Sequence, residues 1–427
     1  MDKKFFDIHF HAFTLSHPDI TAFLNRVNLN KITLPIAGFL GGILSLVTDV
    51  DDRIRNLLSM MENDLGNFFL YLEYYLRNST TERSLSQITD YNKIILTPLM
   101  VDFGYNAPTN RKILYSLPPQ KPVINQVADL FQGIQKYYNY DISITKNASK
   151  QIEIDYLPTT KEKKLFEIYP FVGINPRLYR DEEHLSKFLN KYFSEYASPA
   201  SAPKQLYKKY YEKLGLFNGD VYDKSFNFNF IFSGIKLYPP LDFDPWPTYD
   251  AESRKVRFLY NFCQERNIPI TVHCSDGGFQ VIEKNRAWSY TSISRWTSVL
   301  QSYPNLKINF AHFGSQANNK SKQVYGNWRD GILSLIESGD YPNVYTDFSC
   351  LAMKPSFYRE LKKIADYQSD KFSDHLLFGS DFMINLLWSH SYNEYLKYFF
   401  QSKEISAIRD RLCVDNPSRF IFGGAIG

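Results

Sequence analysis

Apolar runs alternate with amphipathic stretches through the second half of the chain. Helical spacing of apolar residues marks four stretches, and a short, nearly continuous apolar run follows each of them. The predicted helices span 251–266, 291–301, 328–337 and 356–367, and the predicted strands span 269–273, 305–312, 343–347 and 374–381. Runs that stay apolar throughout are typical of parallel strands buried on both faces. The pattern therefore predicts repeated strand–helix units.

The spacing of these strand ends indicates how many units there are. The ends, His273, His312, Asp347 and Asp381, are separated by 39, 35 and 34 residues. A (β/α)₈ barrel uses roughly 31 residues for each strand and helix. We therefore expect an α/β chain that folds as a (β/α)₈ TIM barrel, with its chemistry at the carboxyl ends of the strands.

The first half of the chain is less regular, and its strands are further apart. The strands expected there are 5–11, 91–100, 167–174 and 231–238. Long insertions are expected at about 30–88, 103–164 and 198–227. We interpret them as lid or peripheral elements of one distorted barrel domain that covers residues 1–427.

One uncharged apolar segment, residues 32–47, is too short for a membrane span, which needs about 18 residues or more. We expect it to form a buried or pocket-covering helix. The alternatives are a segment that touches a membrane and one that forms a dimer, so a homodimer is compatible with the sequence.

Composition narrows the class of partner. Lys and Arg total 49 against 45 Asp and Glu, a net charge of +4, which gives no electrostatic case for nucleic-acid binding. The 34 Phe and 31 Tyr residues are expected to fill the core and line a pocket. Four cysteines without paired spacing indicate reduced thiols in a cytoplasmic enzyme. The sequence therefore favours a small-molecule substrate.

Two histidines end the first apolar run, and later strand ends add further ligand types. His9 and His11 are two residues apart, so a strand directs both side chains to the same face. Together with His273 and Asp381 they provide three imidazoles and a carboxylate, a set that suits Zn²⁺, or Mn²⁺ or Fe²⁺ in an expanded site. His312 would lie beside this site as a general acid/base. Each residue alone has a structural alternative, and Asp381 could cap a helix, but the ordered set favours a metal.

Two further residues are candidates for substrate binding. Arg177 follows the third predicted strand and could hold a substrate carboxylate through two hydrogen bonds. The alternative for Arg177 is a surface salt bridge. Tyr238 ends the fourth predicted strand and could line the pocket, with ordinary aromatic packing as its alternative.

The ordered set of motifs resembles the amidohydrolase superfamily, and within it the amidohydrolase-related branch that includes aminocarboxymuconate semialdehyde decarboxylase. The segments that carry the resemblance are Asp7-Ile-His9-Phe-His11, Gly234-Ile-Lys-Leu-Tyr-Pro239, Thr271-Val-His273, Ala311-His312-Phe-Gly314, Asn343-Val-Tyr-Thr-Asp347 and Phe378-Gly-Ser-Asp381. The resemblance implies that His9, His11, His273 and Asp381 bind the metal. It also implies that His312 is the catalytic histidine.

The resemblance also draws attention to Lys236. In binuclear members of the superfamily a lysine on the fourth strand can be carbamylated and bridge two metals. The alternative is an ordinary ammonium that binds a substrate carboxylate, and we favour one metal over two.

The function expected from these residues is metal-dependent hydrolysis. Water activated by the metal would attack an amide, ester or lactone carbonyl of a small molecule, and Asp381 would take up its proton. The alternative is a metal-dependent, non-oxidative decarboxylase of a small unsaturated or aromatic acid, in which Arg177 would clamp the carboxylate. A third hypothesis is a barrel that binds a ligand without catalysis.

Overall fold

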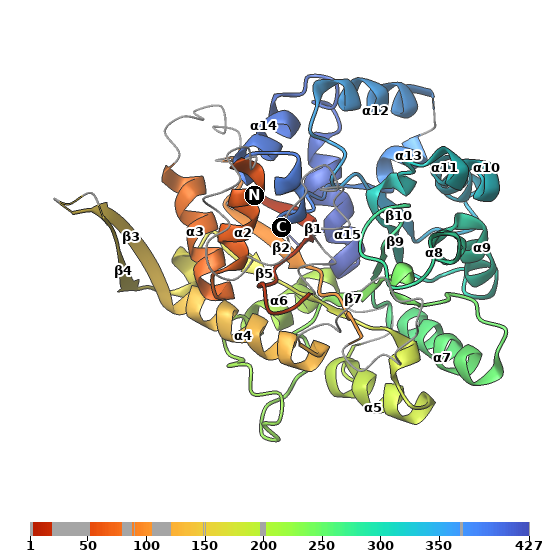
Figure 1. Cartoon of the computed structure of the whole chain (residues 1–427), viewed down its shortest axis with the longest axis horizontal. Coiled ribbons are helices and arrows are strands. Elements are labelled where there is room, and N and C mark those ends of the chain that lie inside the picture. The colour runs from red at the N-terminus through yellow and green to blue at the C-terminus, as the bar shows by residue number, and fades with distance from the viewer. Residues whose placement is uncertain are drawn as a thin grey trace, which may run out of the picture.

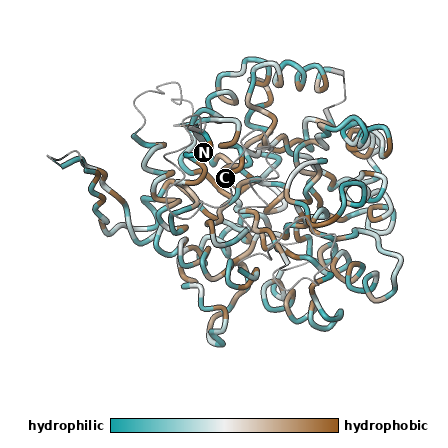
Figure 2. Tube along the Cα trace, in the orientation of Figure 1, coloured by the Kyte–Doolittle hydropathy of each residue, from teal (hydrophilic) through white to brown (hydrophobic). Residues whose placement is uncertain are grey.

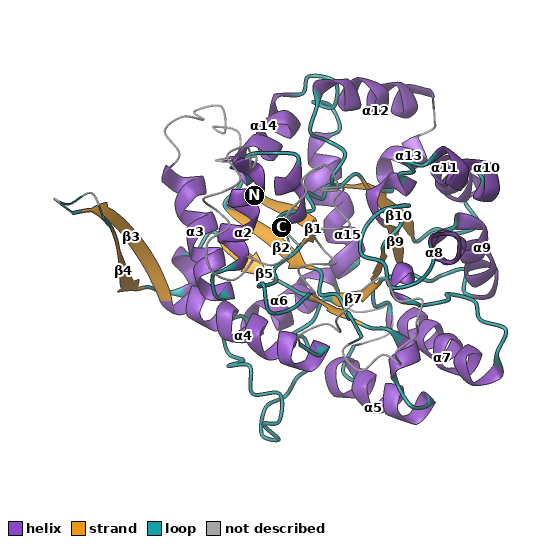
Figure 3. Ribbon diagram, viewed as in Figure 1, coloured by secondary structure: helices purple, strands orange, loops and turns teal. Residues whose placement is uncertain are grey.

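Short parallel strands gather in the middle of the molecule, and helices surround them (Figures 1 and 3). The computed structural model describes residues 3–18, 52–78, 88, 90–104, 121–147, 149, 151–196, 202–367 and 370–426. The central strands are β1 (Lys4–Phe10), β2 (Lys93–Pro98), β5 (Phe166–Ile168), β6 (Phe171–Gly173), β7 (Gly234–Leu237), β8 (Ile270–Val272), β9 (Ile308–Phe310), β10 (Val344–Asp347) and β11 (Leu376–Leu377).

Pairing between neighbouring strands closes these segments into a barrel. One sheet has the order β1-β2-β5 and another the order β11-β10-β9-β8-β7-β6, with every pair parallel. Parallel bridges join the two sheets at Leu99 with Phe171 and at Phe10 with Phe382. Strands β5 and β6 occupy one position that is interrupted at Pro170, which has no backbone N–H. Eight strand positions result, and the predicted (β/α)₈ barrel is confirmed.

The outer helices follow the strands as expected, with additions. Four of them, α7, α9, α11 and α12, correspond to the predicted helices, whereas α8 and α10 were not predicted. The helices of the second half and the one after β6 are α5 (Glu182–Phe193), α7 (Asp250–Arg266), α8 (Lys284–Thr291), α9 (Ile293–Ser302), α10 (Asn319–Tyr325), α11 (Trp328–Ser338), α12 (Pro355–Tyr367), α13 (Asp370–Asp374), α14 (Tyr392–Gln401) and α15 (Asn416–Phe422).

The three expected insertions contain most of the remaining elements. They are α2 (Asp52–Met61) and α3 (Leu65–Asn78) in the first, α4 (Val123–Asn139) with the antiparallel strands β3 (Tyr140–Lys146) and β4 (Ile152–Pro158) in the second, and α6 (Pro203–Lys213) in the third. The β3–β4 hairpin extends away from the body of the molecule (Figure 1). The apolar segment 32–47 lies outside the described residues. Among the helices that are described, none has the length and apolar character needed to cross a membrane.

Aromatic side chains fill the space between the barrel and its helices. The Phe378 ring lies 4.9 Å from the Phe5 ring and 4.5 Å from the Phe399 ring, centroid to centroid, so β1, the end of β11 and α14 pack together. The tube coloured by hydropathy shows apolar segments toward the middle and polar ones on the outer helices (Figure 2). The high aromatic content therefore serves the core, as expected.

Candidate metal centre

Three side chains from the first and last strand positions meet at the carboxyl end of the barrel. His9 lies in β1, His11 follows it, and Asp381 follows β11. The Asp381 backbone N–H donates to the His9 carbonyl oxygen at 2.7 Å, which fixes the two strand ends together. Asp381 Oδ1 lies 3.3 Å from His9 Nε2 and 3.2 Å from His11 Nε2. All three side chains are buried.

Hydrogen bonds on the far side of each imidazole assign its tautomer. His9 Nδ1 lies 2.9 Å from the Asp347 carboxylate, and His11 Nδ1 lies 2.9 Å from the Leu99 carbonyl oxygen. Both partners accept hydrogen bonds, so each Nδ1 carries the proton and each Nε2 presents a lone pair. His9 Nε2 is buried and has no hydrogen-bond partner among the described residues.

Three electron-pair donors therefore face one another, and His9 Nε2 has no hydrogen-bond donor among the described residues. Burial raises the pKa of the Asp381 carboxyl, whereas protonated imidazoles at His11 and His9 would hold that pKa well below its usual value. A carboxylate and two neutral imidazoles around one point repel each other unless a cation lies between them. The donor set fits Zn²⁺, Mn²⁺ or Fe²⁺.

A second shared carboxylate orients the histidines. Asp347, at the end of β10, accepts from His9 Nδ1, from Asn309 Nδ2 at 2.7 Å and from the His312 backbone N–H at 3.0 Å. Burial raises the pKa of the Asp347 carboxyl, but His9 and the other hydrogen-bond donors lower that pKa below its usual value. A carboxylate behind a metal-binding imidazole fixes the ring and increases its basicity. The side chains of Asn309 and Ser349 also contact Asp347. The sequence analysis did not identify these two residues, because a single polar residue forms no recognisable pattern.

His312 lies beside the three donors, in a strained backbone conformation. Its φ of 59° is in the left-handed region, and the turn carries its ring to 4.8 Å from the His9 ring, centroid to centroid. His9, His312 and Asp381 each offer a ligand atom within 4.8 Å of the others. Burial lowers the pKa of His312 to about 4, so the ring is neutral at pH 7. Its Nδ1 lies 2.9 Å from Ser349 Oγ.

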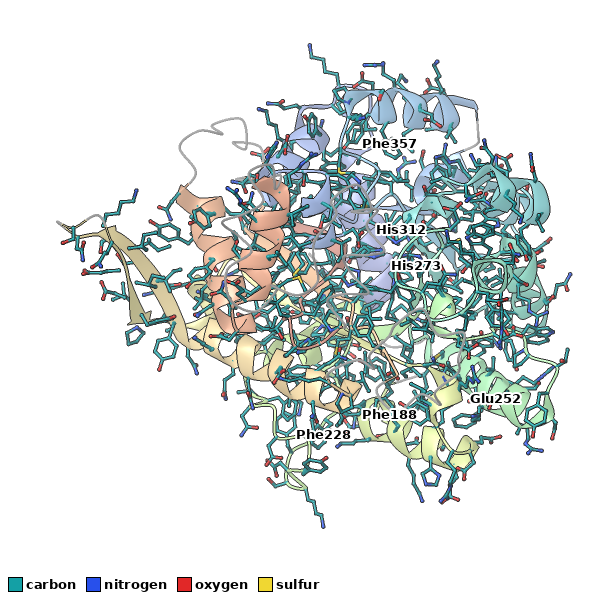
Figure 4. All side chains as sticks on the ribbon, viewed as in Figure 1. Phe188, Phe228, Glu252, His273, His312 and Phe357 are labelled. Carbon is teal, nitrogen blue, oxygen red and sulfur yellow. The ribbon has the colours of Figure 1, made fainter. Side chains whose placement is uncertain are left out.

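His273 reaches the same end of the barrel but is engaged elsewhere. Its ring is 5.0 Å from that of His312, and Figure 4 shows the two labels side by side in the middle of the molecule. His273 Nε2 lies 3.1 Å from the Gly277 carbonyl oxygen, and its ring stacks on Tyr238 with 4.3 Å between centroids. Metal binding through Nε2 would replace the bond to Gly277, so the ligand role of His273 stays a prediction.

Lys236 is buried on β7, below the histidines. It is 1% exposed, and its Nζ has no hydrogen-bond partner among the described residues. Burial lowers its pKa to about 8, against the opposing influence of Asp347 and Asp381. A substantial neutral fraction at pH 8 is what carbamylation needs, whereas the protonated form would suit a substrate acid.

A cavity of about 490 Å³ opens above these groups. Its walls include His11, His273, His312 and Asp381, and also Tyr238, Phe279, Cys350 and Trp388. The Tyr238 hydroxyl accepts a hydrogen bond from the Phe279 backbone N–H at 2.9 Å, so Tyr238 holds the loop that forms one wall. Sequence reasoning missed Cys350 and Trp388, which lie in irregular segments after their strands.

Arg177 does not line this cavity. Its guanidinium pairs with the Asp242 carboxylate and is 38% exposed, and both residues line a separate surface pocket with Arg286. Asp242 adopts a left-handed turn after β7, which brings its carboxylate to Arg177. This pairing favours the alternative of a surface salt bridge, and the carboxylate clamp stays a prediction.

Part of the sequence matches a known protein family. The sequence model of the family described as amidohydrolase matches residues 229–422, which include Lys236, His273, His312 and Asp381. The match covers less than half of the chain. His9 and His11 lie outside the match, and the barrel brings them to it through β1. No curated protein matches the sequence.

Several solved structures resemble this chain at low identity. A 5-carboxyvanillate decarboxylase from Novosphingobium aromaticivorans, complexed with manganese, has 10% identity and a TM-score of 0.44, over 98% of this chain and 96% of that chain. A probable 2-pyrone-4,6-dicarboxylic acid hydrolase from Acinetobacter baumannii has 11% identity and a TM-score of 0.41, over 99% and 100%. A 4-oxalomesaconate hydratase from Rhodopseudomonas palustris has 13% identity and a TM-score of 0.42, over 98% and 95%.

Proposed function

We propose that this chain is a metal-dependent hydrolase that attacks an amide, ester or lactone carbonyl of a small molecule. The observation that carries the proposal is the convergence of three electron-pair donors, His9 Nε2, His11 Nε2 and Asp381 Oδ1, at the base of a cavity. The family match over residues 229–422 supports an enzyme of this kind. A barrel that only binds a ligand would not need this arrangement of lone pairs.

His9, His11 and Asp381 would hold the metal, with His273 as a further ligand if its ring leaves Gly277. Zn²⁺ is our first choice for this set, and Mn²⁺ or Fe²⁺ would also fit. When bound, such a cation lowers the pKa of a coordinated water toward about 7 and polarises a carbonyl oxygen. Asp347 keeps the His9 ring in the tautomer that offers Nε2.

The protein's own groups would handle the proton and the developing charge. Asp381 lines the cavity and is ionised, so it can accept the proton of the attacking water and return it to the leaving group. His312 is neutral near pH 7 and its Nδ1 donates to Ser349, so its Nε2 has a lone pair that can accept a proton from the attacking water and then pass it to the leaving group. Tyr238 positions the substrate against one wall.

The lining of the cavity favours hydrolysis over decarboxylation. Among the described residues, no Arg or Lys lines it, and Arg177 is paired with Asp242. A site that holds the carboxylate of a planar acid is expected to present such a cation. The decarboxylase remains the alternative, with Lys236 below the cavity as its substrate-binding cation.

Turnover with defined metals tests the proposal. The metal-free protein and the protein reloaded with Zn²⁺, Mn²⁺ or Fe²⁺ would be assayed on esters, lactones and amides, and on aromatic and unsaturated acids for release of CO₂. We expect hydrolysis that depends on the metal. Release of CO₂ without hydrolysis would select the decarboxylase, and no metal-dependent turnover on either panel would overturn the enzyme assignment.

The state of Lys236 separates one metal from two. We propose a free amine and one metal. Mass spectrometry after trapping carbamates in ¹³C-bicarbonate, together with elemental analysis, would measure both. An unmodified Lys236 with one metal per chain supports the proposal, and a labelled Lys236 with two metals contradicts it.

A further inference from the structure

A second large pocket lies at the opposite end of the barrel from the candidate metal centre. Its volume is about 560 Å³, and its walls include Asn267, Lys307 and Asn343, which precede β8, β9 and β10, and Arg419 in α15. These positions are at the amino ends of the strands, whereas the catalytic residues of such barrels lie at the carboxyl ends. The proposed hydrolase chemistry makes no use of this pocket.

Lys307 is the unusual residue of the pocket. It is 4% exposed, and its Nζ has neither a hydrogen-bond partner nor an ion pair among the described residues. At the end of α7, Cys263 O accepts from the backbone N–H groups of Asn267 and Ile268, and Gln264 O also accepts from that of Asn267. An ammonium buried without an acceptor carries a large desolvation cost. Burial alone lowers the pKa of Lys307 to about 7.

The remaining charges around the pocket are predominantly positive. Arg419 is exposed, and its Nη1 donates to the Asp374 carbonyl oxygen at 3.4 Å. Arg266 stacks on Phe262, with 4.0 Å from its guanidinium carbon to the ring centroid. The acid in the described lining is Glu265, which pairs with Arg266 at 3.4 Å and accepts from Asn261 at 2.7 Å. Its carboxylate is therefore already shared.

We propose that this pocket binds an anionic group of a small molecule, a phosphate or a carboxylate, between the Lys307 ammonium and the Arg419 guanidinium. The anion would supply the acceptor that Lys307 lacks, and the guanidinium would add a charge-assisted hydrogen bond. The volume exceeds that of a single phosphate, so the anionic group is part of a larger molecule. The ligand is thus an organic phosphate or carboxylate that binds at the end of the barrel away from the metal.

Sulfate and malonate are suitable probes, because one is tetrahedral, the other carries planar carboxylates, and neither titrates at pH 8. Isothermal titration of the whole protein with each would be compared with titration of Lys307→Met and Arg419→Gln. Lys362→Met is the matched control, since Lys362 is an exposed lysine on α12 that pairs with Asp366. Chloride at equal ionic strength corrects for screening.

We expect the wild type and Lys362→Met to bind at least one probe. Lys307→Met and Arg419→Gln should bind it about ten- to a hundredfold more weakly. Binding at pH 8 should also take up protons in the wild type, because an anion favours the charged form of Lys307. Preference for sulfate would indicate a phosphate ligand, and preference for malonate a carboxylate. No binding of either probe, or equal binding by all four proteins, would overturn the proposal. If Lys307→Met does not fold, the binding by Arg419→Gln and the proton uptake of the wild type still test the proposal.

Discussion

The two ends of the barrel bury unpartnered polar atoms of opposite kinds. At the carboxyl ends of the strands, lone pairs of His9, His11 and Asp381 face one another, and His9 Nε2 has no hydrogen-bond partner among the described residues. At the amino ends, the Lys307 amino group has no hydrogen-bond acceptor within the part of the chain that the structure describes. A buried group without a partner costs free energy, so each end is expected to be completed by a ligand of the opposite charge. The first end calls for a cation and the second for an anion.

The metal centre and the Lys307 pocket are formed by different parts of the barrel. Polar residues at or after the carboxyl ends of the strands form the metal centre, and residues that precede the strands form the Lys307 pocket. Changes at one end should therefore leave the other intact. The variants that follow test this independence, from the largest expected effect to the smallest.

Asp381→Ala should have the largest effect on activity. It removes a metal ligand and the proton acceptor together, so we expect kcat/KM to fall by about 10³-fold or more. Steady-state kinetics would measure it on whichever substrate the panel identifies. Asp366→Ala, on the exposed face of α12, is the matched control and should keep full activity. Activity of Asp381→Ala within tenfold of the wild type would refute its role.

Asp347→Asn should act through His9 and His312 rather than through the metal directly. Asparagine keeps the shape of the side chain but loses the charge that holds the His9 tautomer, so metal affinity should fall about ten- to a hundredfold. Competition with a chelating dye would measure that affinity. Excess metal should restore much of the activity, and a variant that stays inactive when fully loaded would show that Asp347 does more than orient the ligand.

Lys307→Met should increase stability and leave hydrolysis unchanged. The pKa of Lys307 is about 7 in the folded protein, below its value in the unfolded chain. At pH values between these two pKa values, the unfolded state therefore binds more protons than the folded state. The contribution of Lys307 therefore makes the wild type more stable as pH rises from about 7 toward 10. Urea unfolding at pH 7 and pH 9 should show this slope in the wild type and a smaller one in Lys307→Met. Identical slopes would mean that Lys307 is charged and paired.

Arg177→Ala should have the smallest effect. The guanidinium is partly exposed and pairs with Asp242 outside the cavity, so kcat/KM should stay within about twofold and stability within about 1 kcal/mol. A tenfold rise in KM for an acidic substrate would show that Arg177 binds the substrate carboxylate, as the sequence suggested.

The sequence predicted the second half of the barrel well because strand and helix follow each other there without interruption. Helix 251–266 and α7 agree to within one residue, since its apolar face packs on the barrel. The predicted strand 374–381 shortens to Leu376–Leu377 because the chain turns sharply, with Asp381 at a φ of 60°. The pattern of apolar and polar residues along the chain does not indicate such a turn.

Contacts across long distances in sequence were harder to predict. The pairing of Arg177 with Asp242 and the placement of Asn309 behind His9 both depend on barrel closure, which periodicity does not specify. His9, His11 and Asp381 could be found because each ends a strand, and strand ends of one barrel meet. Lys307 escaped notice because it begins a strand, where ligands are not expected.

The metal content of the purified protein tests the central claim most directly. Elemental analysis would compare the wild type with His11→Ala and Asp381→Ala, using His184→Ala on the exposed helix α5 as the control. We predict about one divalent metal per chain in the wild type and in His184→Ala, and strong loss in the other two. Full metal content in both His11→Ala and Asp381→Ala would contradict the proposed centre.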